Sequence, residues 1–203
     1  MPLDPTIYHI TEISNLPSII HNGLVSDALL ANVPHAVIGY SNIKERRMTE
    51  YRVPCCGNRF VGEFVPFYYC PRSPMLYTIN NGNTGKPAGH QKEIVHLVTT
   101  VSRVAHLGRA WAISDGNAGA AAVSFASDMN ALERMLDWDA IKALDWRGRT
   151  RQKMAEFLVA DAVPWTSIFG VGVIDQTAAQ RVHEVLNGVA HQPEVKVLRN
   201  WYY

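Results

Sequence analysis

The sequence predicts an α+β fold organised around one hydrophobic core. Segments typical of strands are mixed along the chain with segments typical of helices. The chain has 203 residues, 47% of them hydrophobic, which is enough for one substantial core but hardly for two. Because no internal repeat or low-complexity segment interrupts this pattern, we expect a single domain spanning residues 1–203.

The chain is expected to begin with a strand followed by a helix. The strand covers residues 7–11, and the helix extends from about 15 to 22, where Gly23 would end it. Residues 25–41 carry Gly, Asn, Ser and Pro without periodicity and precede a polar helical run at 42–48. This part of the chain is interpreted as a mobile flap.

An aromatic strand is predicted at residues 64–69. It contains Pro66, which lacks an amide hydrogen and therefore favours an edge strand or a bulge. A turn at 71–74 leads into a short apolar turn of helix at 75–77, and the Asn- and Gly-rich residues 80–90 are expected to form a loop.

The second half of the chain predicts more strands than helices. Apolar runs predict strands at residues 93–101, 110–114, 155–160, 168–174 and 195–199. Helices are predicted near residues 127–136, 139–144 and 177–187.

The charge and cysteine content exclude few functions, but they indicate the cellular compartment in which the protein is expected. Nineteen Lys and Arg against 18 Asp and Glu give a net charge of +1, so the overall balance demands no nucleic acid, membrane or acidic ligand. Three cysteines, including the adjacent Cys55 and Cys56, indicate reduced thiols rather than a disulfide framework. No signal peptide and no apolar stretch of roughly 18–20 residues is present, so we expect a cytoplasmic protein without a membrane partner.

Three local motifs are better explained by structure than by chemistry. Residues 116–119 have the wrong glycine spacing for a dinucleotide fingerprint, so a flexible loop is expected. His90, Glu93 and His96 resemble metal ligands in spacing, but strand alternation would point neighbours to different faces, so no metal is expected. Cys70 has no histidine beside it in sequence, and burial is the usual role of such a residue.

A carboxylate, a histidine, an arginine pair and an aromatic tract remain as candidate functional groups. Glu156 begins an apolar strand after a basic loop, and His9 lies in the first strand. Arg46 and Arg47 are adjacent on a helix and cannot share one face, so one of them is expected to be solvated. This set suits glycosyl transfer from a phosphorylated donor, in which a carboxylate stabilises positive charge and an arginine holds a pyrophosphate. Taken alone, each residue could equally be structural.

Five ordered segments of the chain resemble the DarT family of DNA ADP-ribosyltransferase toxins, in its thymidine-modifying branch. They are YHIT at 8–11 with NL at 15–16, IKERR at 43–47, VPFYYCPRSPMLY at 65–77, AEFLV at 155–159 and WYY at 201–203. The resemblance implies an ADP-ribosyltransferase-like fold with a mixed β core and peripheral helices, and NAD as co-substrate without a metal. It also implies single-stranded DNA as acceptor and, as partner, a macrodomain antitoxin that acts as an ADP-ribosyl hydrolase.

The same resemblance implies roles for individual residues. Glu156 matches the family's catalytic glutamate, and Arg47 matches its essential arginine. Residues 31–49 would fold over NAD, and residues 115–156 would select the acceptor. Where many relatives have a second histidine after the first strand's threonine, this chain has Glu12. The candidate NAD-binding residues are His9, Ile10, Thr11, Ser18, Arg47, Tyr68 and Met75.

The implied reaction joins thymine N3 to the anomeric carbon of the NAD ribose. Glu156 would take the N3 proton and stabilise the developing positive charge while nicotinamide leaves. Arg47 is expected to position donor or acceptor, because a guanidinium hardly deprotonates.

DNA binding requires a local patch because the net charge is close to zero. Basic side chains alternate beside a tryptophan shortly before Glu156 and could contact phosphates while the ring stacks on a base, although a solvated loop would have the same composition. The candidates are Arg72, Trp146, Arg147, Arg149, Arg151 and Lys153. Since N3 lies on the pairing edge, the target base must be unpaired or flipped.

Three other functions remain open at this point. The same transfer could act on guanine in DNA, or the acceptor could be RNA or protein. A third possibility is a catalytically silent module that binds NAD or DNA; the presence of Glu156, Arg47 and His9 argues against it.

Overall fold

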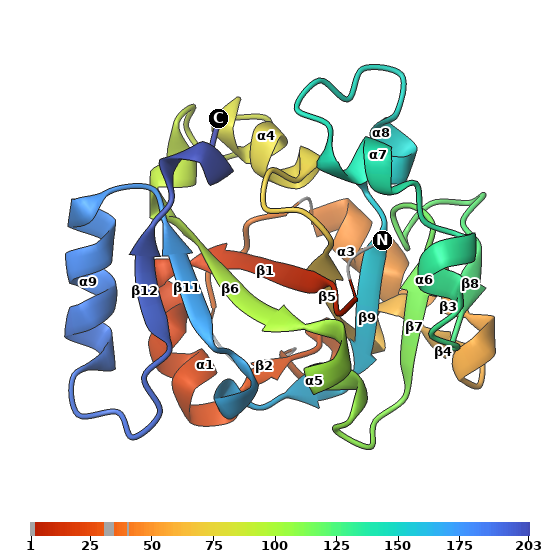
Figure 1. Cartoon of the computed structure of the whole chain (residues 1–203), viewed down its shortest axis with the longest axis horizontal. Coiled ribbons are helices and arrows are strands. Elements are labelled where there is room, and N and C mark those ends of the chain that lie inside the picture. The colour runs from red at the N-terminus through yellow and green to blue at the C-terminus, as the bar shows by residue number, and fades with distance from the viewer. Residues whose placement is uncertain (1–2, 31–34, 40) are drawn as a thin grey trace.

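The chain folds around a mixed eight-stranded β-sheet with helices at its periphery, as Figure 1 shows. The computed structural model describes residues 3–30, 35–39 and 41–203. Neighbouring strands are antiparallel except at one edge, where the last two pair in parallel. In spatial order the strands are β12 (Glu194–Val197), β11 (Gly170–Val173), β6 (Ile94–Thr100), β1 (Thr6–Glu12), β5 (Phe64–Tyr68), β9 (Glu156–Ala160), β7 (Trp111–Ser114) and β8 (Phe125–Ala126).

Two short ribbons lie outside this sheet. One pairs β2 (Leu24–Val25) with β10 (Ala162–Val163), and the other pairs β3 (Arg52–Val53) with β4 (Arg59–Phe60). Gly23, just before β2, has φ of +78°, and a Cβ there would lie 2.6 Å from the Val163 carbonyl oxygen. Only glycine fits this position, which explains why it ends the preceding helix.

The helices are short, and polar side chains begin several of them. Ser73, Asp137 and Asp175 each accept a hydrogen bond from the backbone N–H three residues later, which satisfies an otherwise unpaired donor. In chain order the helices are α1 (Leu16–Asn22), α2 (Asp27–Leu30), α3 (Ser41–Thr49), α4 (Pro74–Asn80), α5 (Val101–Ala105), α6 (Ala131–Arg134), α7 (Trp138–Lys142), α8 (Thr150–Lys153) and α9 (Gln176–Leu186).

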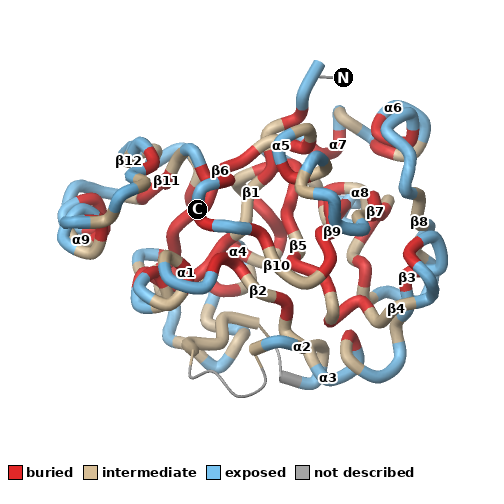
Figure 2. The backbone as a smooth tube through the Cα atoms, turned by 90° about the horizontal axis from the view of Figure 1, so that it is seen from below, coloured by how far each residue is buried: buried red, intermediate tan, exposed pale blue. Residues whose placement is uncertain are grey.

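The hydrophobic core lies along the central strands. Figure 2 shows buried backbone concentrated on β1, β5, β6 and β9, with exposed residues on the outer helices. Ile7, Phe67, Leu97 and Phe157 are fully buried and belong to the largest apolar cluster. Burial of each such side chain contributes roughly 1.5–3 kcal/mol.

The α+β prediction and most predicted elements are confirmed, with shifts at their ends. Every predicted strand has a counterpart in the large sheet, and the predicted helices at 15–22, 42–48, 139–144 and 177–187 correspond to α1, α3, α7 and α9. The helix expected over 127–136 is limited to α6, and the helical turn at 75–77 is longer than expected because Ser73 caps α4. Short elements such as β2, β3, β4 and α8 carry too few residues to show a period.

The prediction that Pro66 lies at a sheet edge or bulge is wrong. β5 lies between β1 and β9, well inside the sheet. However, β1 and β5 share a single register pair, Tyr8 with Tyr68, and the Pro66 carbonyl accepts a hydrogen bond from His9 Nδ1 at 2.8 Å. Because a residue's N–H and C=O point to the same neighbour in a strand, the missing amide hydrogen faces the region where β1 has separated from β5. No ladder bond is lost there.

The C-terminal residues close one end of the sheet, and Figure 1 shows this end of the chain beside α4. Trp201 packs against Gly172, where an added Cβ would lie 2.6 Å from the indole ring. The buried Tyr202 hydroxyl lies within hydrogen-bond distance of the carbonyl oxygens of Ile94 and Gly172, at 2.9 and 3.1 Å, which share its single hydrogen, and it lies 3.2 Å from His96 Nδ1. The terminal aromatic residues therefore stabilise the fold.

We expect stability to fall between neutral and mildly acidic pH because of His96. Its side chain is buried in β6, and burial lowers its pKa from 6.5 to about 4. Between these values the unfolded chain binds a proton that the folded chain does not, so stability present above pH 6.5 is lost as the pH falls toward 4, by up to a few kcal/mol. Urea denaturation at pH 7.5, 6 and 5 measures this loss, and His96→Gln should flatten it. An equal pH dependence in that variant would contradict the assignment.

Among the described residues, we find no helix with the length and apolar character needed to span a membrane.

Candidate active site

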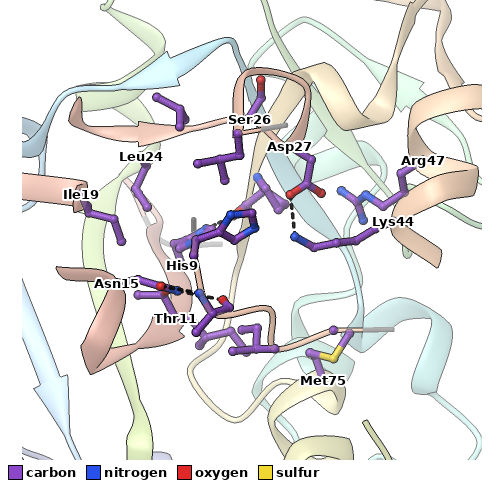
Figure 3. A pocket seen from close by; sticks show the side chains of 18 of the residues that line it. His9, Thr11, Asn15, Ile19, Leu24, Ser26, Asp27, Lys44, Arg47 and Met75 are labelled. Atoms are coloured by element: carbon purple, nitrogen blue, oxygen red, sulfur yellow. Dashed lines mark hydrogen bonds and ion pairs between the residues drawn. The ribbon is translucent and has the colours of Figure 1, made fainter. Parts of the chain in front are cut away.

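A cleft opens where β1 and β5 separate, and it contains all eight predicted catalytic and NAD-binding residues. Its floor comes from β1, β5 and β9, and its other walls come from α1, α2, residues 35–39 and α3. Figure 3 shows side chains that line the cleft, among them those of β1, α1, α2 and α3, around one cavity. The predicted residues that line it are His9, Ile10, Thr11, Ser18, Arg47, Tyr68, Met75 and Glu156.

Glu156 is the buried acid of the cleft, with 2% of its side chain exposed. It is the first residue of β9 and lies directly opposite Tyr68 of β5 and Ser114 of β7, which places these side chains on the same face of the sheet. Its Oε2 accepts a hydrogen bond of 2.8 Å from the Ala118 backbone N–H. The carboxylate is thus held in one orientation, facing the cleft.

Arg47 is the direct partner of Glu156. Its Nη1 donates to both carboxylate oxygens at 3.3 and 3.4 Å, across 109 positions of sequence. Burial, the largest single effect, acts to lower the pKa of Arg47, but the charge of and hydrogen bond to Glu156, together with the smaller effects of Tyr68 and Asp27, raise the pKa overall, so the guanidinium is cationic. Its Nη2 is buried without a hydrogen-bond partner among the described residues. Arg46 is exposed and pairs with Glu50, so only one arginine of the pair enters the site, as predicted.

His9 presents a hydrogen-bond acceptor to the cleft. Burial lowers its pKa, so the imidazole is neutral near pH 7. A carbonyl oxygen can only accept, so the bond to Pro66 assigns the proton to Nδ1 and leaves Nε2 with a lone pair. Such an acceptor suits a sugar hydroxyl.

The loop at residues 115–124 reaches from β7 over Glu156. Asp115 and Ser124 bond at its base, and Arg151 donates to the Asp115 carboxylate at 2.7 Å and the Ala122 carbonyl at 2.9 Å. Near its tip, Asn117 lines the cleft and accepts from the Gly119 N–H at 2.7 Å. Residues 116–119 form a loop as predicted, but these contacts fix the loop against the catalytic side chains.

Residues 35–39 and α3 cover the opposite side of the cleft. The Asn15 side chain bonds the backbone N–H and C=O of Ala36 at 2.8 and 2.9 Å, and Lys44 pairs with Asp27 at 2.8 Å, as drawn in Figure 3. The covering segment predicted at 31–49 therefore lines the cleft in its described part, while residues 31–34 and 40 lie outside the described residues.

Sequence reasoning missed several polar residues that line the cleft, among them Asn15, Asp27, Lys44 and Asn117. Asn15 lay inside the YHIT and NL segment and Lys44 inside the IKERR segment, so both had a family signal. Asp27 and Lys44 lay in the stretch interpreted as a flap, and Asn117 lay in a loop without periodicity. A loop residue has no sequence pattern that points its side chain toward a distant strand.

Two of the DNA-binding candidates, Arg72 and Trp146, belong to one cluster of aromatic rings on the surface near the C-terminus. The Trp146 and Tyr77 rings are 5.6 Å apart, and Tyr77 and Tyr203 are 5.1 Å apart, both edge to face. The Arg72 guanidinium lies 4.4 Å from the Tyr203 ring. These side chains form one partly exposed aromatic and basic cluster, and its central ring, Tyr77, lies on α4, the helix that also sends Met75 into the cleft.

The four remaining DNA candidates do not form one surface. Arg147 is exposed and bonded to Asp145, while Arg149 is exposed without a side-chain partner among the described residues. Arg151 braces the 115–124 loop. Lys153 is only 3% exposed and donates to the carbonyl oxygens of Ile141 and Ala143, so it caps the end of α7 and cannot contact DNA. The basic alternation suggested one face, but α8 is helical, and side chains two apart on a helix point in nearly opposite directions.

Within the described part of the chain, no group of three or more His, Cys, Asp or Glu side chains is arranged to hold a metal ion.

Comparison with known proteins identifies the family. A family model described as "ssDNA thymidine ADP-ribosyltransferase, DarT" matches residues 8–203. The chain belongs to the DarT family. A DNA ADP-ribosyl transferase of Thermus aquaticus is 36% identical over 204 residues, covering 100% of this chain and 90% of the relative.

Solved DarT structures match the fold over the whole chain. Thermus sp. 2.9 DarT in complex with ADP-ribosylated single-stranded DNA superimposes with a TM-score of 0.92 at 34% identity, covering 100% and 98% of the two chains. Its complex with NAD⁺ superimposes with a TM-score of 0.86 at 32% identity, covering 100% and 99%. A more distant relative, from Thermosipho africanus, is a fusion of a DNA ADP-ribosyl transferase with a DNA ADP-ribosyl glycohydrolase; it is 27% identical over 89% of this chain and 45% of its own length.

These matches confirm the predicted family, the ADP-ribosyltransferase-like fold and the use of NAD as co-substrate. As a DarT protein the chain is an NAD-dependent DNA ADP-ribosyltransferase.

Proposed function

We propose that this DarT protein transfers ADP-ribose from NAD to N3 of a thymine in single-stranded DNA and releases nicotinamide. The observation that carries the proposal is the Glu156 carboxylate, oriented by Arg47 and the Ala118 N–H at the end of a cleft, in a chain matching a thymidine-modifying family. The relative solved in complex with ADP-ribosylated single-stranded DNA supports the same acceptor here.

The reaction exchanges one glycosidic bond for another. The bond between the ribose anomeric carbon and the nicotinamide nitrogen breaks, and nicotinamide leaves as a neutral molecule. Thymine N3 bonds to that carbon while its proton passes to Glu156, whose negative charge also stabilises the oxocarbenium-like transition state. Because Arg47 is cationic, it positions substrate rather than taking a proton.

The other residues of the cleft would hold the donor. His9 Nε2 would accept from a ribose hydroxyl, with Ile10 and Thr11 of the same strand forming the adjoining wall. Tyr68 lies beside Glu156 and offers a ring face to nicotinamide, and Met75 offers an apolar contact. Ser18 of α1 completes the candidate NAD-binding set.

Within the single domain, one segment would bind the NAD donor and another would bind the DNA acceptor. Residues 31–49 would fold over NAD, which the contacts of Asn15 with Ala36 support. Residues 115–156 would select the acceptor, since they include both the loop at Glu156 and the partly exposed Trp146. Single-stranded DNA would cross the aromatic cluster, with Arg72, Arg147 and Arg149 contacting phosphates.

Arg149 and Arg151 should respond differently to substitution. Arg149→Ala removes an exposed charge and should reduce the slope of log affinity for single-stranded DNA against log salt by about 0.7. Arg151→Ala should leave that slope nearly unchanged and slow transfer at saturating DNA, because Arg151 braces the loop bonded to Glu156. Fluorescence anisotropy at several salt concentrations and single-turnover transfer measure both effects. Equal changes of slope in the two variants would contradict this distinction.

We further propose that the protein is the toxin of a toxin–antitoxin pair acting in the cytoplasm. The partner would be a macrodomain ADP-ribosyl hydrolase that removes the modification. The Thermosipho africanus fusion, which joins a transferase and a glycohydrolase in one chain, supports this pairing. Expression with and without an active DNA ADP-ribosyl glycohydrolase tests it: growth arrest that the hydrolase relieves is the expected result, and arrest that it does not relieve would contradict it.

Incubation with NAD and single-stranded oligonucleotides that differ only at thymine tests the proposed reaction. Intact-mass analysis should show a gain of one ADP-ribose only where thymine is present. A mass gain on a strand that contains guanine but no thymine would show that guanine is the acceptor. ADP-ribose on RNA or protein, with none on DNA, would show that the acceptor is not DNA. No transfer to any acceptor would indicate a silent binding module.

A further inference from the structure

Three polar groups converge at the Glu156 end of the cleft, and Asn117 is the one that no catalytic role explains. Asn117 lines the cleft, and its Oδ1 already accepts from the Gly119 N–H at 2.7 Å. Its Nδ2 amide is therefore the group left to face a ligand. Arg47 contributes a second donor, Nη2, which is buried without a partner among the described residues. Glu156 contributes the acceptor.

The backbone fixes these groups relative to one another. Ala118, the residue after Asn117, donates its backbone N–H to Glu156 Oε2 at 2.8 Å. This bond holds Asn117 close to the carboxylate. On the other side, Arg47 Nη1 lies 3.3 Å from Glu156 Oε1. A Cβ added at Gly119 would lie 3.3 Å from Arg47 Cγ, which shows that the loop packs directly on the arginine.

Asn117 Nδ2, the Glu156 carboxylate and Arg47 Nη2 thus offer a hydrogen-bond donor, an acceptor and a second donor. This set complements the pairing edge of one nucleobase. The pairing edge of thymine presents O2 as acceptor, N3–H as donor and O4 as acceptor. We propose that Asn117 is the specificity-determining residue for the acceptor base: its Nδ2 and Arg47 Nη2 donate to the two carbonyl oxygens of thymine while Glu156 accepts the N3 proton. This inference rests on the proposed function and specifies how the same site selects its acceptor.

The arrangement predicts the order of preference among bases. Uracil has the same edge as thymine and should be modified equally well, because the set does not contact the methyl group. Cytosine presents a donor at N4 and an unprotonated N3, so two of the three contacts fail. Guanine matches at O6 and N1–H, but its 2-amino group would face a second donor. An unpaired buried donor typically reduces the rate roughly 10–100-fold, so cytosine and guanine should both be poor acceptors.

The test combines a protein variant with a substrate variant. Asn117→Asp keeps the oxygen that the Gly119 N–H requires but replaces the donating NH2 with a negatively charged oxygen, whereas Asn117→Ala removes the whole amide without adding a charge. Each is compared with wild type on a single-stranded oligonucleotide carrying one thymine, 2-thiothymine or 4-thiothymine, since sulfur accepts hydrogen bonds poorly. Single-turnover transfer is followed by intact mass, and Asn187→Asp, an exposed position after α9, is the matched control.

We expect Asn117→Asp and Asn117→Ala to slow transfer to thymine roughly 10–100-fold. The transfer rate of the wild type should fall about 10-fold on the thio-substituted base whose sulfur replaces the oxygen that contacts Asn117. The same sulfur substitution should not slow the Asn117 variants further, because they lack that contact. The sulfur also changes the acidity of N3, but that effect is common to all proteins and cancels in the comparison. Asn187→Asp should behave as wild type.

The inference is overturned if both sulfur substitutions slow the variants as much as the wild type, or if neither slows the wild type. The second outcome needs no variant, so it holds even if an Asn117 variant fails to fold. Failure of the proposed function gives a different result, because the wild type would then modify no thymine at all.

Discussion

Replacing Glu156 with glutamine should slow ADP-ribose transfer to DNA by roughly 10²–10⁴-fold while NAD still binds. Glutamine keeps the shape of the side chain and an oxygen for the Ala118 N–H, but it can neither accept the N3 proton nor stabilise positive charge on the ribose. Single-turnover transfer measured by intact mass gives the rate, and a fluorescence titration gives the NAD affinity.

Glu133→Gln provides a matched control for that experiment. Glu133 lies on α6 and is exposed, so the same chemical change there should alter the transfer rate by less than about twofold. Near-normal transfer by Glu156→Gln would remove Glu156 from the mechanism, and loss of NAD binding would assign it to the donor site instead of to proton transfer.

Replacing Arg47 with glutamine should abolish transfer and also destabilise the protein by about 3–5 kcal/mol. The cost arises because Glu156, with 2% of its side chain exposed, would keep a buried charge without its cationic partner. For a chain of this size the melting temperature should fall by roughly 10 °C. Differential scanning calorimetry or urea denaturation measures the change.

A double variant separates the charge effect from loss of packing. In Arg47→Gln with Glu156→Gln no buried charge remains at this position, so the double variant should be more stable than Arg47→Gln alone. Arg46→Gln is the control: Arg46 is exposed, and its pair with Glu50 at a spacing of four residues contributes less than about 1 kcal/mol. Additive losses in the double variant would show that packing, and not charge, sets the cost.

Local sequence signals made some residues candidates, and the family resemblance gave them roles. Glu156 stood out because an acid precedes an apolar strand, and His9 because it lies in a short alternating strand; both line the cleft. Because adjacent helical residues cannot share one face, one of the two arginines was predicted to be solvated, and Arg46 is the exposed one. For Lys153 the same approach failed, because an alternating pattern was applied to residues that form a helix.

The sequence by itself determined seven of the eight strands of the sheet and the end of α1 at Gly23, because each depends on a few neighbouring residues, and it identified the family from five ordered segments. Only the tertiary structure decided the partners inside the cleft. Arg47 and Ala118 meet Glu156 from positions 109 and 38 residues away, and Asn15 holds Ala36 across 21 residues. Such contacts depend on strand order and on the separation of β1 from β5 at Pro66, and no periodicity within a single segment encodes either.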